Sequence, residues 1–322
     1  MRILITGGAG YLGTVTVQTL LDAGHEVRIL DSLIHGDAPA LHLLGRARFE
    51  LVRGDVRDPG AVELAVRGME AVVHLAAIVG DPACAKSPDV ARAVNLDASV
   101  ALFEAASRAG VARFLFASTC SNYGRMAETT TLATEDHPLR PVSFYAEAKV
   151  AVEQRLLGDH DHDRTPAVTV LRFATLYGLS PRMRFDLTVN EFTLELARGR
   201  RLTVFGEQFW RPYVHVRDAA RAIHLALESP AAADCVLNVG DTTENYRKLD
   251  LVGLIREAVP EGQVDFVHRA EDPRDYKVAF ERIHAMLGFT ITRRVRDGIR
   301  EIEAAVRAGF FKDADASHYR NI

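Results

Sequence analysis

The sequence predicts an α/β protein: a doubly wound parallel sheet followed by a smaller C-terminal α/β lobe. Two observations predict this class. Short apolar runs alternate with helical patterns through the first half of the chain, and these runs are apolar on both faces, as in strands that helices cover on both sides. After about Gly178 the alternation loosens. We expect residues 1–178 to form the sheet domain and residues 179–322 the lobe, with an approximate boundary that the chain can cross again.

The expected elements follow in order along the chain. Six runs have the length and composition of buried strands: 2–6, 25–30, 48–52, 71–75, 113–118 and 167–173. Amphipathic helices separate them at 15–21, 61–66 and 88–109. In the lobe we expect helices at 186–197, 218–228, 247–258 and 295–308, and short apolar runs at 213–216 and 264–268. A ligand is expected in the crevice between the two parts.

The composition excludes several classes of protein. With 322 residues, 48% of them hydrophobic, the chain can bury a large core. Its formal charge of −4 comes from nearly balanced acidic and basic residues, which argues against a nucleic-acid partner. The apolar runs are shorter than the roughly 20 residues of a membrane helix, and the first residues resemble a strand running into glycines rather than a signal peptide. We expect no membrane partner and a cytoplasmic location.

The metal-binding residue types are too few or too scattered for a site. Three cysteines, Cys84, Cys120 and Cys235, suit neither a disulfide framework nor a zinc site. The segment 158–164 alternates aspartate and histidine, but its place between a helix and a strand favours a solvated loop. We therefore expect no metal.

A glycine-rich segment follows the first expected strand directly. Gly7, Gly10 and Gly13 have the spacing that allows a tight turn, close approach of the backbone to a pyrophosphate, and close packing of the next helix on the sheet. The second strand leads to Asp31, 18 residues past Gly13. A carboxylate there accepts hydrogen bonds from the adenosine ribose and repels a 2′-phosphate, so NAD is favoured over NADP. The alternative is a glycine turn that serves packing alone, with Asp31 as a solvated strand end.

Tyr145 and Lys149 are four residues apart at the start of a helical pattern, so both project from one face. A lysine ammonium favours the phenolate and lowers the pKa of a neighbouring tyrosine, which makes the tyrosine a base for a hydroxyl proton. Thr119, just past an apolar strand, can share that proton. In the alternative, the tyrosine packs, the lysine extends along the surface, and the threonine caps a turn.

These residues together resemble the extended short-chain dehydrogenase/reductase superfamily of sugar-nucleotide epimerases and dehydratases, which has a Rossmann-type sheet. The resemblance covers nearly the whole chain and includes the glycine motif, the Thr119/Tyr145/Lys149 set and the segments 74–77, 171–178 and 211–218. It implies NAD as cofactor, a nucleoside-diphosphate sugar as substrate, and a homodimer. The cofactor contacts it implies are Gly7, Gly10, Tyr11, Leu12, Gly13, Asp31, Asp55, Val56, Leu75, Ala76, Ala77, Tyr145 and Lys149. The substrate contacts it implies are Thr119, Ser121, Asn122, Thr175, Asn190, Arg211 and Arg274.

The chain departs from the superfamily's patterns at two places. In 4,6-dehydratases the catalytic threonine is followed by an Asp-Glu pair that eliminates water, whereas here Cys120 and Ser121 follow Thr119. Cys120 is either an acid/base in its own right or a buried, inert residue. Thr175 replaces an asparagine, so contacts to the substrate phosphates are expected to differ.

Three segments, 76–84, 180–186 and 271–276, look like the branch that includes GDP-heptose 4-dehydrogenases. The shared chemistry is oxidation at C4 of the sugar by NAD. The hydride then returns, as in a 4-epimerase, or the ketone leaves, as in a 4-dehydrogenase. The alternatives are a dehydratase or 4-ketoreductase of the same fold, and a non-catalytic NAD-binding scaffold.

Two further expectations concern surfaces. Arg182 and Arg184 lie in a predicted loop; they could reach the substrate, although loop arginines are usually exposed. The homodimer is expected to form through the helices that contain residues 90–109 and 145–157. Its apolar contacts would include Val100, Leu102, Val150 and Val152, although each of these could also face the core.

Overall fold

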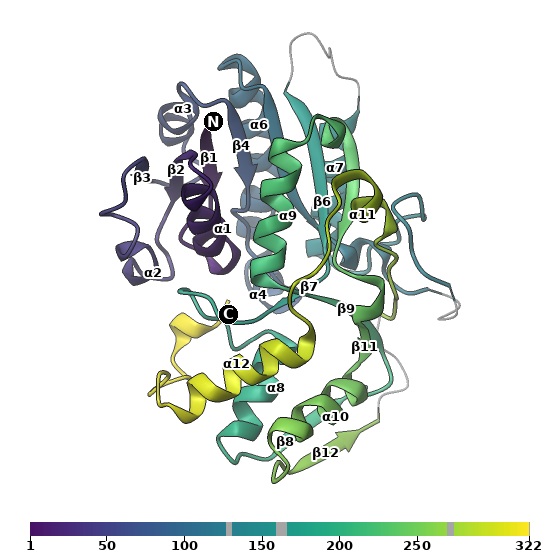
Figure 1. The fold of residues 1–322 in the computed structure, drawn as a ribbon. Helices are drawn as coiled ribbons and strands as arrows, with labels where there is room; N and C mark the ends of the chain where they lie inside the picture. Colours follow the sequence, from purple (N-terminus) through teal and green to yellow (C-terminus); the bar gives the residue numbers. More distant parts are fainter. Residues whose placement is uncertain (127–130, 159–165, 269–273, 322) are drawn as a thin grey trace.

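A seven-stranded parallel sheet forms the centre of the molecule (Figure 1). The computed structural model describes residues 1–126, 131–158, 166–268 and 274–321. The strand order is β10-β6-β5-β4-β1-β2-β3, so the direction of winding reverses between β1 and β4. Ligands of such sheets bind beyond the carboxyl ends of the strands at that reversal. The strands are β1 (Arg2–Thr6), β2 (Glu26–Asp31), β3 (Phe49–Arg53), β4 (Ala71–His74), β5 (Arg113–Thr119), β6 (Ala167–Phe173) and β10 (Cys235–Val239).

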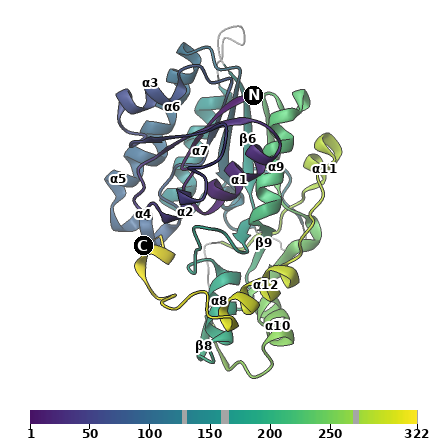
Figure 2. The same ribbon diagram turned by 60° about the vertical axis from the view of Figure 1, so that its left-hand side comes forward.

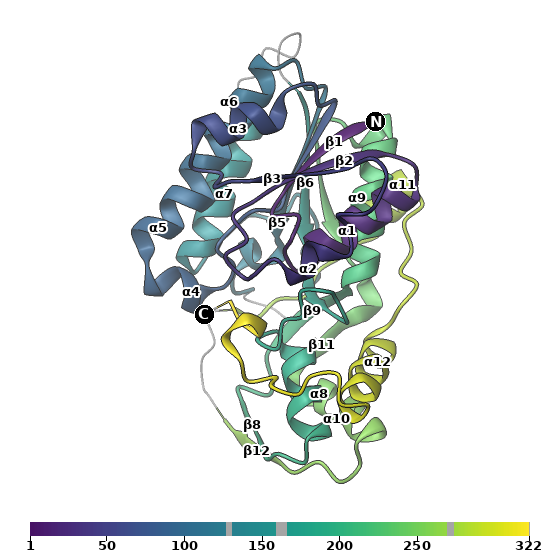
Figure 3. The same cartoon turned by 90° about the vertical axis from the view of Figure 1, so that its left-hand side faces the viewer.

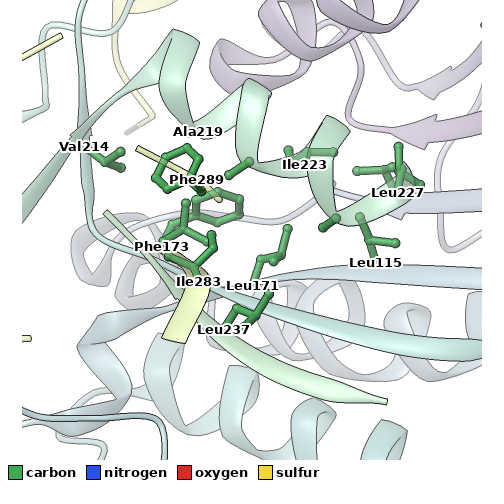
Figure 4. Close-up of a cluster of buried hydrophobic side chains, with 14 of the residues drawn as sticks. Leu115, Leu171, Phe173, Val214, Ala219, Ile223, Leu227, Leu237, Ile283 and Phe289 are labelled. Atoms are coloured by element: carbon green, nitrogen blue, oxygen red, sulfur yellow. The ribbon is translucent and has the colours of Figure 1, made fainter. Parts of the chain in front are cut away.

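Helices cover both faces of the sheet, which confirms the predicted doubly wound class (Figures 1 and 3). One face carries α1 (Tyr11–Asp22) and α9 (Val216–Glu228), with α11 (Glu281–Leu287) beside them. The other carries α3 (Pro59–Val66), α6 (Ala98–Arg108) and α7 (Phe144–Leu157). Figure 4 shows the core under α9, where one stripe of the helix meets the apolar side chains of β5, β6 and β10. The residues in this contact include Ala219, Ile223, Leu227, Leu115, Leu171 and Leu237.

The stretch expected as one helix over 88–109 is divided in the structure. It consists of α5 (Pro88–Arg92), a π-helical turn (Ala93–Asp97) and α6. Inside that turn the buried Asn95 accepts a hydrogen bond from the Ile78 amide at 2.8 Å and donates one to the Ile78 carbonyl at 2.9 Å. This pair anchors the loop after β4. A further short helix, α4 (Asp81–Lys86), was not predicted.

The chain beyond residue 178 contributes to both parts of the molecule. The lobe contains a three-stranded sheet of β7 (Thr175–Tyr177), β9 (Trp210–His215) and β11 (Asn245–Arg247), and a two-stranded one of β8 (Leu202–Phe205) and β12 (Val264–Val267). Three helices pack on them: α8 (Thr188–Ala197), α10 (Lys248–Ala258) and α12 (Val295–Arg307). The chain crosses back, because α9 packs on the large sheet and β10 pairs with β6. The division at residue 178 thus remains an approximate prediction.

Within the described residues, no helix is both long enough and apolar enough to cross a bilayer.

Candidate active site

A cavity of about 640 Å³ lies where the sheet domain meets the lobe. Volumes of this size are typical of sites for small molecules and cofactors. Most residues that the sequence analysis proposed as cofactor or substrate contacts line it: Gly7, Gly10, Tyr11, Leu12, Gly13, Asp31, Asp55, Val56, Leu75, Ala76, Ala77, Thr119, Ser121, Tyr145, Lys149, Thr175, Arg211 and Arg274.

The glycine loop between β1 and α1 has the geometry of a phosphate cradle. Gly7 has φ +71°, and a Cβ there would lie 2.8 Å from the Ala76 amide nitrogen. A Cβ on Gly13 would lie 2.1 Å from the Gly7 carbonyl oxygen. Side chains at these positions would therefore separate the loop from β4 and from the start of α1. Because the loop stays bare, the amide groups at the N-terminus of α1 are open to a pyrophosphate.

Asp31 at the end of β2 holds the loops around it. Its two oxygens accept hydrogen bonds from the amides of Ala9 at 2.9 Å and Leu33 at 2.8 Å. Burial raises the pKa of Asp31, and these two hydrogen bonds offset part of the rise. Each carboxylate oxygen can accept a second hydrogen bond, so Asp31 can also receive the hydroxyls of a ribose.

Helix α7 positions Tyr145 and Lys149 beside the end of β5. The helix begins after Ser143, whose hydroxyl accepts a hydrogen bond from the Ala146 amide. The Lys149 ammonium donates to the Ala117 carbonyl at 2.8 Å and lies 5.9 Å from the centre of the Tyr145 ring.

The charges of this pair differ from the sequence expectation. Burial lowers the pKa of Lys149 to about 8. Burial also raises the pKa of Tyr145 above its usual value, and the charge of Arg184 offsets part of that rise. The net shift of the Tyr145 pKa is upward, opposite to the lowering expected from Lys149, because desolvation of the phenolate outweighs the charge of Arg184.

The cations expected to contact the substrate lie on the lobe side of the cavity. Arg274 forms an ion pair with Asp81 at 3.0 Å. The Arg211 guanidinium lies 5.3 Å from the centre of the Tyr276 ring, and the Tyr276 hydroxyl is 3.2 Å from the Ser121 hydroxyl. Two guanidinium groups beside one cavity suit a diphosphate. Tyr276 was not named as a site residue, although it closes the segment 271–276 that the sequence analysis singled out.

Three proposed residues lie outside the cavity wall. Cys120 is buried, donates a hydrogen bond to the Arg172 carbonyl at 3.2 Å, and has a pKa raised by burial well above its usual value. Asn122 donates to Glu153 at 2.8 Å within the core. Asn190 is buried and bonded to the Gly178 amide at 2.9 Å and the Arg184 carbonyl at 2.9 Å. These side chains support the cavity wall from behind.

The structure decides between the two alternatives for Arg182 and Arg184. Neither is exposed as loop arginines usually are: their exposed fractions are 3% and 7%, and both line the cavity. His35, Asp186 and Asn321 also line it and were not proposed. The resemblance of segment 180–186 was the one signal that could have pointed to the two arginines.

One group of possible metal ligands occurs in the described residues, although the sequence analysis expected none. Ligand atoms of His25, His224 and Glu228 lie within 4.8 Å of one another. His25 and Glu228 already contact each other at 3.3 Å. His25 directly precedes β2 at its amino end, whereas the cavity lies at the carboxyl ends of the strands. The group therefore takes no part in the cavity. The segment 158–164, which the sequence analysis set aside as a solvated loop, falls outside the described residues after Gly158.

Comparison with known proteins decides the family. The sequence profile of the NAD-dependent epimerase/dehydratase family matches residues 3–240. The chain belongs to this family. As a family member it takes NAD as cofactor, and the glycine cradle and Asp31 fit that group.

Several family members are similar over nearly their whole length. A dTDP-glucose 4,6-dehydratase of Streptomyces griseus is 33% identical over 92% of both chains. A UDP-glucose 4-epimerase of Corynebacterium glutamicum is 30% identical over 90% of this chain and 91% of its own. The structure of a Thermus thermophilus UDP-glucose 4-epimerase with NAD superposes with a TM-score of 0.83 and 29% identity, covering 95% of this chain and 99% of its own. Family members thus include both epimerases and dehydratases.

Proposed function

We propose that this chain oxidises C4 of a sugar carried on a nucleoside diphosphate. One observation carries the proposal: Thr119, Tyr145 and Lys149 line the same cavity as the glycine cradle on one side and Arg211 and Arg274 on the other. The cavity thereby joins a dinucleotide site, a proton-transfer group and cations suited to a diphosphate.

Each side chain has a defined role in the proposed reaction. Tyr145 accepts the proton of the C4 hydroxyl, Lys149 stabilises the phenolate by its charge, and the Thr119 hydroxyl shares the proton. NAD, when bound, accepts the hydride from C4. The products of this step are a 4-keto sugar and NADH.

The fate of the keto sugar separates the possible activities. Return of the hydride to the other face makes a 4-epimerase, and release makes a 4-dehydrogenase, as in the GDP-heptose branch that the sequence resembles. The 4-epimerases among the relatives favour return of the hydride. The dehydratases among them keep elimination of water as a second candidate. Against it, no acidic residue occupies the two positions after Thr119.

The experiment is incubation of the purified protein with UDP-glucose, dTDP-glucose, GDP-mannose and a GDP-heptose, followed by NADH absorbance and NMR of the products. An inverted C4 without net NADH indicates a 4-epimerase, and accumulating NADH with a 4-keto sugar indicates a 4-dehydrogenase. A product that has lost water would instead establish the dehydratase.

A Tyr145→Phe control should lose about 10²–10⁴-fold in kcat while it keeps NAD. Equal turnover by that variant would refute the proposed role of Tyr145. Absence of turnover on every sugar, with NAD retained, would favour a scaffold.

A further inference from the structure

Arg182 is a buried cation in the cavity wall with no ion-pair partner in the described parts of the chain. Its exposed fraction is 3%. One terminal nitrogen donates to the Arg320 carbonyl at 3.2 Å, while Nε has no hydrogen-bond partner. The neighbouring Arg184 is instead paired with Asp186 at 2.7 Å. Asp186 acts on Arg182 by its charge, but it is paired with Arg184, whose own charge repels Arg182. A guanidinium withdrawn from water without a paired carboxylate is costly, so Arg182 is placed to receive an anion.

The position of Arg182 shows which side of the cavity that anion occupies. Two residues earlier, the Ser180 hydroxyl donates to the Tyr11 carbonyl at 2.7 Å and lies 3.1 Å from the Thr14 hydroxyl. These contacts tie the segment to the first turn of α1. On the other side is His35, in the loop after Asp31, whose pKa is lowered to about 4 by burial and by the charges of Arg182 and Arg184. Arg182 therefore lines the cavity near the first turn of α1 and the loop after Asp31.

The C-terminal tail fixes this segment from outside. The Phe185 amide donates to the Tyr319 carbonyl at 2.8 Å, and the Asn321 amide donates to Asp186 at 3.2 Å. The Phe185 ring makes edge contacts with Phe311 at 4.9 Å and Tyr319 at 5.5 Å between ring centres. Figures 2 and 3 show the yellow tail running from α12 across the lobe to end beside α4 of the sheet domain. The tail thus spans the boundary of the two parts at the cavity.

We propose that Arg182 binds the pyrophosphate of NAD and that the tail residues Tyr319–Asn321 hold Arg182 in place. The glycine cradle contacts the pyrophosphate from the sheet domain, and Arg182 contacts it from the lobe. The cofactor is then held between the two parts while the sugar reacts. Because Arg211 and Arg274 already supply cations on the substrate side, Arg182 is assigned to the cofactor. This inference rests on NAD binding and not on the reaction proposed above.

The test measures binding rather than turnover. Protein stripped of cofactor is titrated by calorimetry with NAD and with ADP-ribose, which retains the pyrophosphate but lacks nicotinamide. Arg182→Met should raise both dissociation constants about tenfold or more, because it removes a charged hydrogen-bond donor. Arg182→Lys should recover part of the affinity, since it keeps the charge and loses the planar fork. The matched control is Arg201→Met, which removes an exposed arginine that pairs with Asp265 at 2.9 Å on the lobe surface.

Two results would overturn the assignment of Arg182 to the pyrophosphate. One is an ADP-ribose dissociation constant for Arg182→Met within about twofold of the wild-type value, a change too small for a lost charged hydrogen bond. The other is a loss of affinity for UDP, GDP or dTDP at saturating NAD instead, which would assign Arg182 to the substrate. Should Arg182→Met fail to fold, Arg182→Lys decides the role of the side chain.

Tyr319→Ala tests the role of the tail. NADH should dissociate faster from this variant, as followed by NADH fluorescence, and an unchanged dissociation rate would contradict the tail's role. If the protein binds NAD but converts no sugar, the proposed reaction fails while these binding measurements still test the role of Arg182.

Discussion

Lys149 combines a buried ammonium with a role that requires its charge. Its pKa is lowered from 10.5 to about 8, chiefly by burial. The proposed stabilisation of the Tyr145 phenolate therefore weakens as pH rises past about 8. We predict that kcat/KM, which reports the free enzyme, falls above that pH. The control variant Lys149→Met should have a low kcat/KM that does not fall further above pH 8.

Unfolding cannot explain such a fall. Between pH 8 and 10.5 the unfolded lysine is protonated while the folded one is not, so the unfolded state binds more protons and the contribution of Lys149 to stability rises with pH. Thermal melts of the cofactor-free protein across this window separate the two effects. A kcat/KM that stays flat to pH 10 would contradict the assigned role.

Cys120 is predicted to be structural. Its thiol is buried against the Arg172 carbonyl and its pKa is raised well above the usual value, so it does not exchange protons near neutral pH. Cys120→Ala should leave kcat unchanged and lower the free energy of unfolding by about 1 kcal/mol, through the small cavity it creates. A hundredfold fall in kcat with NAD retained would instead make Cys120 a catalytic acid or base.

At the scale of single residues, the sequence predicted cavity residues whose neighbours in the chain already determine their position. Gly7 directly follows β1 and Asp31 ends the adjacent parallel strand β2, so local pattern is enough to bring them together. Arg182 differs, because its hydrogen-bond partner, the Arg320 carbonyl, lies 138 residues further along the chain in the C-terminal tail. Asn190, which was expected to contact substrate, forms hydrogen bonds with the Gly178 amide and the Arg184 carbonyl. No local pattern reveals such partners.

At the scale of elements, a buried ion pair locks α7 to the sheet. Arg172 on β6 donates to both oxygens of Glu153 on α7, to Oε1 at 3.2 Å and to Oε2 at 2.7 Å, and both side chains are at least nine-tenths buried. Ser118 at the end of β5 also donates to Glu153. Since α7 carries Tyr145 and Lys149, this network sets where the catalytic face of the helix lies.

Breaking that pair should be costly. We predict that Glu153→Leu lowers the free energy of unfolding by about 3–5 kcal/mol, because it leaves the Arg172 charge buried and unpaired. The double variant Glu153→Leu/Arg172→Met should recover part of the loss. As a control, Glu261→Leu removes an exposed pair with Arg307 and should cost less than about 1 kcal/mol. Urea unfolding measures all three, and equal costs for the buried and exposed pairs would contradict the prediction.

The strands of the large sheet were easier to predict than the elements of the lobe. Buried parallel strands have continuous apolar runs, and the first six were found within one or two residues of their observed ends. Strands β7 and β11 have three residues each, too short for a period to show. The break of the expected helix 88–109 depends on Asn95 bonding the backbone of Ile78, a tertiary contact with no sign in the helical pattern.

At the scale of the whole molecule, the tail and the returning β10 join two parts that the sequence presents as consecutive. The tail contributes Ala314, Phe311 and Tyr319 to an apolar cluster that also contains Tyr11 of α1 and Phe185 of the lobe. Residues near both ends of the chain thus share one core beside the cavity. The C-terminal residues therefore contribute to the structure around the cavity, a contact that composition and periodicity cannot indicate.

The homodimer through α6 and α7 stays a prediction, and the structure narrows the residues that would mediate it. Leu102 and Val152 belong to the core and cannot contribute. Val150 is 9% exposed, whereas Val100 on α6 is partly exposed. A stable dimer of usual size covers roughly 800 Å² on each partner, which two helices of this length can provide. In such a dimer, Val100→Asp would bury a carboxylate without a partner in the interface, and the free-energy cost would be large enough to separate the subunits.

Light scattering with size-exclusion chromatography tests the predicted homodimer through α6 and α7. The wild-type protein should have twice the 35.4 kDa mass of the chain, and Val100→Asp should shift it to the monomer. Leu64→Asp on α3, where the leucine is 53% exposed, is the matched control and should stay dimeric. Because α7 carries Tyr145 and Lys149, the monomeric variant should also lose kcat as the unsupported helix loosens. A wild-type protein that runs as a monomer, or a Val100→Asp variant that remains a dimer, would exclude this interface.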